Sequence, residues 1–162
     1  MLGAEDEAFD AFVRTSSTSL LRTAALLAGD AELGRDLLQA ALVQALLRWR
    51  SIDAPAAYVR RVMATTVIDW KRRRRYAEVP LPDRDLRAAP DPMVVVDNRE
   101  LALRLLRSLP PAQRVVLTLR FFEDLTEAAT AEVLGISVGA VKSATSRGLQ
   151  ALRPRANQEV ER

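Results

Sequence analysis

Cysteine and histidine are both missing from this sequence of 162 residues. Without cysteine the chain can form no disulfide bond, thiolate metal site or cysteine nucleophile. Without histidine it also lacks the commonest general base and the commonest metal ligand. No glycine-rich loop of the kind that cradles phosphates is present either. A hydrolase or transferase is therefore disfavoured, and we expect no enzyme activity, no catalytic residues, no metal and no cofactor.

Aromatic residues and long apolar runs are also scarce. Only 5% of the residues are aromatic although 49% are hydrophobic, so the core must consist mostly of leucine, valine and alanine. Leucine and alanine favour helices. No stretch approaches the length of a membrane span, and the acidic start MLGAEDEAF does not resemble a signal peptide. We expect a soluble, cytoplasmic, all-α protein that makes no contact with a membrane.

Positive charge is concentrated in one stretch of the chain. The net charge is only +3, and arginine supplies nearly all of the positive charge. Arg60, Arg61 and the run from Lys71 to Arg75 lie close together in the sequence, whereas acidic residues are scattered or gather between 83 and 97. A basic patch on a nearly neutral protein indicates a polyanionic partner.

Helical periodicity occurs in two blocks that a proline-rich segment separates. The helices expected in the first block run from Phe9 to Ala28, from Asp30 to about Trp49 and from Ala56 to about Tyr76. Four prolines then break the pattern, at Pro80, Pro82, Pro90 and Pro92, and periodicity resumes at Asn98. We therefore expect two small helical domains, 1–79 and 98–162, joined by a Pro-rich linker over 80–97.

A helix-turn-helix is predicted in the second block. Thr126 caps a short helix that ends at Leu134, and Ser137 caps a longer helix from Val138 to about Leu152. The helix before them opens at Ser108–Pro111, and its expected inner face consists of Val115, Val116, Leu119 and Phe122. The C-terminal domain is thus predicted to be a helix-turn-helix bundle.

Residues within this motif meet the needs of two helices that cross steeply. Ala131 allows a close approach, and Gly135 tolerates the left-handed backbone of the turn. Leu134, Ile136 and Val141 supply apolar inner positions. The spacing agrees with the DNA-binding form of the motif, and the alternative is an ordinary helical hairpin with a glycine turn.

The second helix of the motif would lie in the major groove. Its exposed face is expected to carry Ser137, Gly139, Lys142, Ser143, Ser146 and Arg147. Lysine and arginine donate to guanine edges or phosphates, and serine can donate or accept. We expect Lys142 and Arg147 to provide most of the specificity, with Arg153 contacting phosphate.

Two helices of the first block have features that indicate binding to nucleic acid or to a protein partner. Trp70 and Tyr76 bracket the basic run, a combination that suits single-stranded or distorted nucleic acid, although a solvated helix end is the alternative. Asp69 either pairs with an arginine or accepts from a base amine. The leucine-rich helix from Asp36 to Leu47 is apolar around most of its circumference, so it is either buried core or a docking surface.

The order of these pieces resembles the extracytoplasmic-function (ECF) sigma factors of bacterial RNA polymerase, in particular their sigma-E-like subfamily. The strings that carry the resemblance are Leu109–Arg114, Glu132–Ser143, Ala57–Val62, and Gly29–Asp30 followed by Asp36–Gln39. It extends from Phe9 to Arg153. Where family members usually carry an acidic, an aromatic and an asparagine residue, this chain has Ala40, Leu46 and Thr65.

The resemblance implies roles for each helix in promoter-specific transcription initiation. Contacts to the polymerase β′ coiled coil are implied for Asp36, Leu37, Gln39, Ala40, Val43, Leu46 and Leu47. Reading of the −10 element, together with the loop Ser51–Ala57, is implied for Arg60, Arg61, Thr65, Asp69, Trp70, Lys71, Arg72, Arg73 and Arg74. The C-terminal helix would read the −35 element as duplex.

The partners that the resemblance implies are core RNA polymerase, promoter DNA and an anti-sigma factor. The main alternative is a polymerase-independent regulator in which the N-terminal helices form a dimerisation or sensing module. A palindromic operator and a stable dimer would favour that alternative. The basic aromatic helix argues against it, because a sensor does not need one.

Overall fold

The structure, a computed structural model, describes the backbone of residues 3–77 and 98–160 and the side chains of 3–70, 72 and 100–154. The expected all-α fold is confirmed, and these described ranges contain no strand. The predicted linker, 80–97, lies outside them. The described helices include none that is long and apolar enough to cross a membrane.

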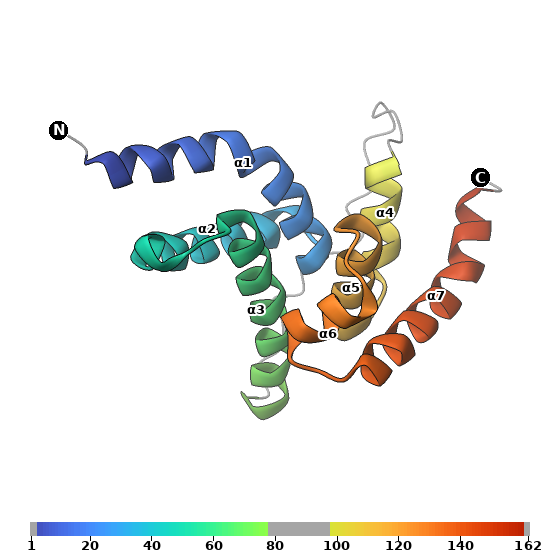
Figure 1. Cartoon of the computed structure of the whole chain (residues 1–162). Coiled ribbons are helices and arrows are strands. Elements are labelled where there is room, and N and C mark those ends of the chain that lie inside the picture. Colours follow the sequence, from blue (N-terminus) through green and yellow to red (C-terminus); the bar gives the residue numbers. More distant parts are fainter. Residues whose placement is uncertain (1–2, 78–97, 161–162) are drawn as a thin grey trace.

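The helices of the N-terminal part are α1 (Ala4–Ala28), α2 (Ala31–Leu47), a short 3-10 helix (Trp49–Ser51) and α3 (Pro55–Ala77). Those of the C-terminal part are α4 (Asn98–Arg107), α5 (Pro111–Leu117), a π-helical turn (Thr118–Phe122), α6 (Glu127–Leu134) and α7 (Val138–Val160). In Figure 1, α1, α2 and α3 form one group, and α4 to α7 lie against one side of it. The two groups touch where α3 meets α5 and α6, and where α1 meets α4, α5 and the π-helical turn.

The connection between α1 and α2 follows the predicted capping residues. Gly29 ends α1 in the left-handed conformation, with a φ of 77°. The carboxylate of Asp30 then caps α2 by accepting a hydrogen bond from the backbone N–H of Leu33 at 2.8 Å. Four residues later, Gly34 lies against α1, where a Cβ atom would be only 2.7 Å from the backbone nitrogen of Ala25. Glycine therefore permits the close approach of α1 and α2.

One hydrophobic core extends over both parts of the chain. Its N-terminal members include Leu20, Leu27, Leu37 and Met63, which are all almost completely buried. The same cluster contains Val115 and Leu119 of the C-terminal part, and the partly buried Leu125, Val133 and Leu134 pack against it. Val115 and Leu119 of the C-terminal part are therefore buried in the same core as the N-terminal helices.

The π-helical turn changes which residues face this core. Its characteristic hydrogen bond runs from the backbone N–H of Glu123 to the carbonyl of Thr118 at 3.1 Å. Because a π-turn inserts an extra residue, the helical phase after Thr118 is shifted. Phe122, expected on the inner face, is instead 47% exposed, so that prediction was wrong. Glu123 points inward, with 13% of its side chain exposed.

Candidate nucleic-acid and polymerase interfaces

The helix-turn-helix has the caps and the turn that the sequence predicts. The hydroxyl of Thr126 accepts from the N–H of Ala129 at 3.0 Å, and that of Ser137 accepts from the N–H of Ala140 at the same distance. Gly135 adopts the left-handed conformation, with a φ of 65°. These local interactions fix the start of both helices of the motif.

A small apolar cluster holds the two helices of the motif together. Val141 of α7 is fully buried against Ala131 of α6 and Val116 of α5. Ile136 was expected at an inner position but is 40% exposed, because it lies in the turn beside Gly135, beyond the end of α6. The crossing therefore depends on Ala131 and Val141, and Ile136 contributes to the surface.

The predicted DNA-reading face of α7 is open to solvent. All of its predicted members are exposed: Ser137, Gly139, Lys142, Ser143, Ser146, Arg147 and Arg153. The helix extends to Val160 through Pro154, beyond the predicted end near Leu152. The structure thus places Gly139, Lys142, Ser143, Ser146, Arg147 and Arg153 on one long helix, and Ser137 forms the cap that precedes it.

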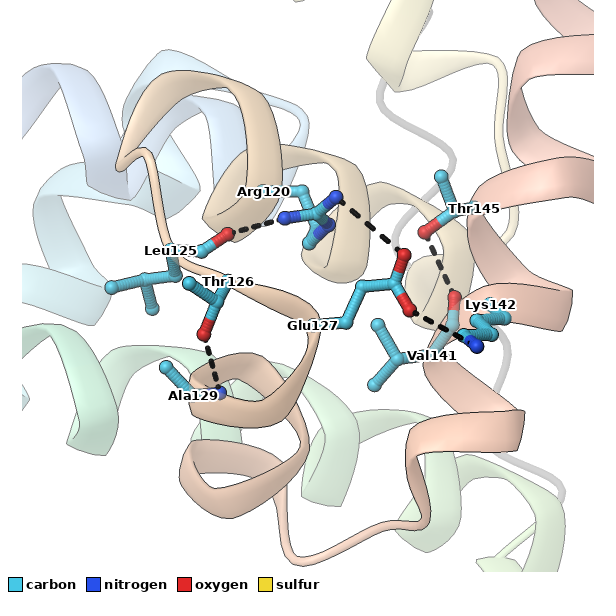
Figure 2. Close-up of polar contacts among 8 residues, drawn as sticks. All are labelled: Arg120, Leu125, Thr126, Glu127, Ala129, Val141, Lys142 and Thr145. Atoms are coloured by element: carbon cyan, nitrogen blue, oxygen red, sulfur yellow. Dashed lines mark hydrogen bonds and ion pairs between the residues drawn. The ribbon is translucent and has the colours of Figure 1, made fainter.

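Glu127, to which no sequence signal pointed, lies between Lys142 of the motif and Arg120 of the preceding π-helical turn (Figure 2). Its carboxylate is 3.9 Å from the ammonium of Lys142 and 3.8 Å from the guanidinium of Arg120. Arg120 also donates to the carbonyl of Leu125 at 2.7 Å. Glu127 begins α6 and Lys142 lies early in α7, so only the crossing of the two helices brings them together.

The predicted −10 residues of α3 differ in exposure. Arg61, Asp69 and Arg72 are exposed, whereas Thr65 and Trp70 are half-buried. The side chains of Lys71, Arg73 and Arg74 lie outside the described residues. Thr65 donates its hydroxyl hydrogen to the carbonyl of Arg61 at 2.9 Å, so this β-branched residue is accommodated within the helix.

A hollow of about 420 Å³ lies beside the loop that precedes α3. The 51–57 loop and its neighbours contribute most of the wall: Arg48, Ser51, Ile52, Asp53, Ala54, Ala57, Tyr58 and Arg61. Val133 of α6 completes the wall. The predicted −10 loop therefore faces a hollow that the helix-turn-helix helps to enclose.

The leucine-rich helix α2 is both core and surface. Leu37, Leu38, Ala41 and Ala45 are buried in the shared core. Leu37 is only 1% exposed and belongs to this core, so its side chain is not at the surface of α2, and its predicted contact with polymerase stays a prediction. The other predicted contact residues are exposed: Asp36, Gln39, Ala40, Val43, Leu46 and Leu47. Leu47 is the most exposed large hydrophobic residue of the described ranges, at 79%.

Glu123 of the C-terminal part makes polar contacts with two helices of the N-terminal part. Its carboxylate lies 2.9 Å from the Nε of Arg60 in α3 and accepts a hydrogen bond from the hydroxyl of Thr23 in α1. No sequence signal pointed to this residue, because an isolated glutamate after two phenylalanines is expected to be exposed to solvent. Its position depends on the π-helical turn, which the hydrophobic pattern does not reveal.

Two arginines of the C-terminal part bind the end of α1. Arg107 donates to the carbonyl of Gly29 at 2.8 Å, and Arg114 donates to the carbonyls of Leu27 at 2.9 Å and Leu109 at 3.1 Å. The last carbonyls of a helix have no partner within the helix and carry partial negative charge. The guanidinium groups of the C-terminal part therefore provide hydrogen-bond donors for the last carbonyls of α1.

Comparison with known proteins agrees with this arrangement. Residues 99–152 match the family model described as Sigma-70, region 4. The chain is 39% identical over 151 residues to the RNA polymerase sigma-E factor of Streptomyces coelicolor, covering 90% of this chain and 84% of that protein.

Two solved structures share the fold. The sigma factor RpoE, determined in complex with the anti-sigma factor NepR from Bartonella quintana, has a TM-score of 0.69 and 19% identity, and the match covers 91% of this chain and 96% of that one. CnrH, determined in complex with the cytosolic domain of CnrY, has a TM-score of 0.61 and 21% identity over 94% and 89% of the two chains. These two likenesses concern the fold, and the match to the sigma-E factor shows that the chain belongs to the ECF sigma factors, which bind core RNA polymerase and direct promoter-specific transcription initiation.

Proposed function

We propose that α7 reads the −35 element of the promoter as duplex DNA. The exposed face of α7, which begins at the Ser137 cap, is the single observation that carries this assignment. Lys142 and Arg147 supply its long cationic side chains, and small residues between them allow a deep fit in the major groove. Arg147 and Arg153 contact phosphates, which fix the register of the helix on the duplex.

We further propose that α3 and the loop Ser51–Ala57 read the −10 element in single-stranded form. The exposed Arg61 and Arg72 supply charge for phosphates, and the half-buried Trp70 supplies an aromatic ring on the same helix. The hollow beside the loop offers space for an unstacked base. Unstacking costs a few kcal/mol per base, and such contacts offset that cost.

The exposed apolar face of α2, formed by Val43, Leu46 and Leu47, is the proposed binding site for the polymerase β′ coiled coil. An aliphatic patch at these positions favours an apolar partner surface. We also propose that the protein acts in the cytoplasm, has no catalytic activity of its own and is held by an anti-sigma factor. The same face of α2 is accessible to that partner.

Reconstitution with core polymerase tests the proposal as a whole. The protein should co-elute with core enzyme and produce new start sites on genomic DNA fragments. A stable dimer that binds a palindromic operator without polymerase would support the alternative regulator instead.

The recognition helix is tested by Lys142→Ala and Arg147→Ala in this reconstituted system. Each should weaken binding to the −35 duplex by about 1–3 kcal/mol if the side chain contacts a base. Arg14→Ala, which removes an exposed arginine from α1, is the matched control and should leave binding unchanged. Unaltered promoter choice in both α7 variants would contradict the assignment.

The basic run is tested separately, because phosphate contacts carry no sequence information. Replacing Arg72, Arg73 and Arg74 with glutamine should lower affinity for all promoters to a similar extent. It should also flatten the dependence of affinity on salt, since fewer counterions are released on binding. A salt dependence equal to that of the unaltered protein would argue against this role.

A further inference from the structure

Glu127 begins α6 beside Lys142 of α7, a residue that the proposed −35 reader uses. We propose that Glu127 determines promoter specificity: its carboxylate restrains the ammonium of Lys142 for contacts with bases and keeps it from neighbouring phosphates. This inference rests on the proposed role of Lys142 in reading the −35 element. Because Glu127 acts through the lysine, it is a positioning residue.

The carboxylate of Glu127 turns a different oxygen toward each of its two cations. Its Oε1 is 3.8 Å from the Nη2 of Arg120, and its Oε2 is 3.9 Å from the Nζ of Lys142. Figure 2 shows the carboxylate between the guanidinium and the ammonium. The oxygen that faces Lys142 is therefore not shared with Arg120.

Arg120 is the fixed side of this bridge. Its side chain is only 23% exposed, and it donates to the carbonyl of Leu125 at 2.7 Å. Its guanidinium carbon also lies 5.8 Å from the centre of the Phe121 ring. The side chain of Lys142 is 67% exposed, so it is the member that can move. A carboxylate held by a fixed guanidinium can therefore restrain a lysine that solvent surrounds.

Lysine depends on such a restraint for selectivity. Its ammonium is a point charge on a flexible stem, and it binds phosphates as readily as guanine edges. Three donors allow Lys142 to contact a base while one N–H still points at Glu127. In helix-turn-helix complexes the first helix of the motif crosses the DNA backbone. A carboxylate at the start of α6 therefore makes phosphate contacts by this lysine less favourable than base contacts.

Removal of the carboxylate would change the charge offered to DNA. Glu127, Lys142 and Arg120 together carry one net positive charge, and Glu127→Gln would leave two. Each additional phosphate that is neutralised steepens the slope of log affinity against log salt by about 0.9. An exposed ion pair restrains its side chains only weakly. We therefore expect a change of a few fold in selectivity, with DNA binding retained.

Binding of the reconstituted holoenzyme to two promoter fragments tests this inference. One fragment carries the −35 element of a start site mapped in the reconstitution, and the other has the same −35 bases scrambled. Glu127→Gln should lower the ratio of the two affinities about two- to fivefold, by tighter binding to the scrambled fragment. Its salt dependence should also be steeper. Glu132→Gln removes the same charge from an exposed position of α6 and should leave the ratio unchanged.

A double-mutant cycle shows whether Glu127 acts through Lys142. In the Lys142→Ala background, Glu127→Gln should no longer change the ratio, because the lysine that it restrains is absent. Glu127→Asp keeps the charge but withdraws the carboxylate by one methylene group, so its ratio should be intermediate. Full selectivity in the aspartate variant would show that charge alone suffices and would overturn the positioning role.

The outcomes separate this inference from the proposed function. If Lys142→Ala alone leaves binding to the −35 fragment unchanged, the assignment of Lys142 is wrong. If Lys142→Ala weakens that binding but Glu127→Gln leaves the ratio unchanged, the proposed function stands and this inference is overturned. An effect of Glu127→Gln that persists in full without Lys142 would also overturn it, because the carboxylate would then repel DNA directly. A lower ratio that disappears in that background supports the proposal.

Discussion

Glu123 and Thr130 are polar residues in largely buried positions, but only one of them has its polar group satisfied. The carboxylate of Glu123 has partners on two helices. The hydroxyl of Thr130 is completely buried and finds no hydrogen-bond partner among the described residues. An unsatisfied buried hydroxyl destabilises a fold, so Thr130 marks a position in α6 that is not optimised for stability.

Thr130→Val should therefore stabilise the protein. Valine has nearly the same shape and removes the unsatisfied hydroxyl, so we expect a gain of about 1 kcal/mol. For a domain of this size that gain corresponds to a rise of about 2–4 °C in the melting temperature. Thr145→Val is the control, because the hydroxyl of Thr145 donates to the carbonyl of Val141 at 2.8 Å. A lower melting temperature for Thr130→Val would show that the hydroxyl has a partner.

At the scale of single elements, the sequence predicts where the helices lie better than it predicts which of their residues face the core. Residue type and spacing predict α1, α2, α3 and the helix-turn-helix, and the caps at Asp30, Thr126 and Ser137 are confirmed. The π-helical turn was not predicted, since its extra residue leaves no mark in the apolar pattern. That one residue places Phe122 at the surface and Glu123 between the N-terminal and C-terminal parts.

The crossing of α1 and α2 provides a prediction at this scale. Gly34→Ala should destabilise the protein by about 1–3 kcal/mol, because the new methyl group would meet the backbone of Ala25 and both helices would have to move. Gly139→Ala makes the same chemical change on the open face of α7, where the nearest atom is 3.8 Å away. It should be neutral or stabilising by up to about 1 kcal/mol. Chemical denaturation of both variants measures the difference, and equal effects would contradict the close packing.

For the whole molecule, the shared core makes the stability of the two parts interdependent. Val115 and Leu119 lie in the same cluster as Leu20, Leu27 and Met63. The polar contacts of Arg107 and Arg114 with the end of α1 reinforce this apolar contact. We therefore expect the described N-terminal and C-terminal helices to unfold together in the free protein.

Leu119→Ala tests this interdependence with a natural probe. The two tryptophans, Trp49 and Trp70, both lie in the N-terminal part, so their fluorescence reports on that part alone. Loss of the buried Leu119 side chain should cost about 2–5 kcal/mol and lower the unfolding midpoint seen by tryptophan fluorescence. Leu149→Ala, at a more exposed position, should have little effect. An unchanged tryptophan midpoint for Leu119→Ala would mean that the two parts unfold independently.

The sequence by itself determined the helical class, the capping residues and the exposed residues of α7. These depend on interactions between near neighbours along the chain, and apolar spacing and cap chemistry report such interactions directly. Only the tertiary structure decided that Leu37 is core, that Glu127 lies beside Lys142 and that Glu123 joins α1 to α3. Each of those contacts joins residues from different elements, and its geometry depends on helix phase and crossing, which no local pattern specifies.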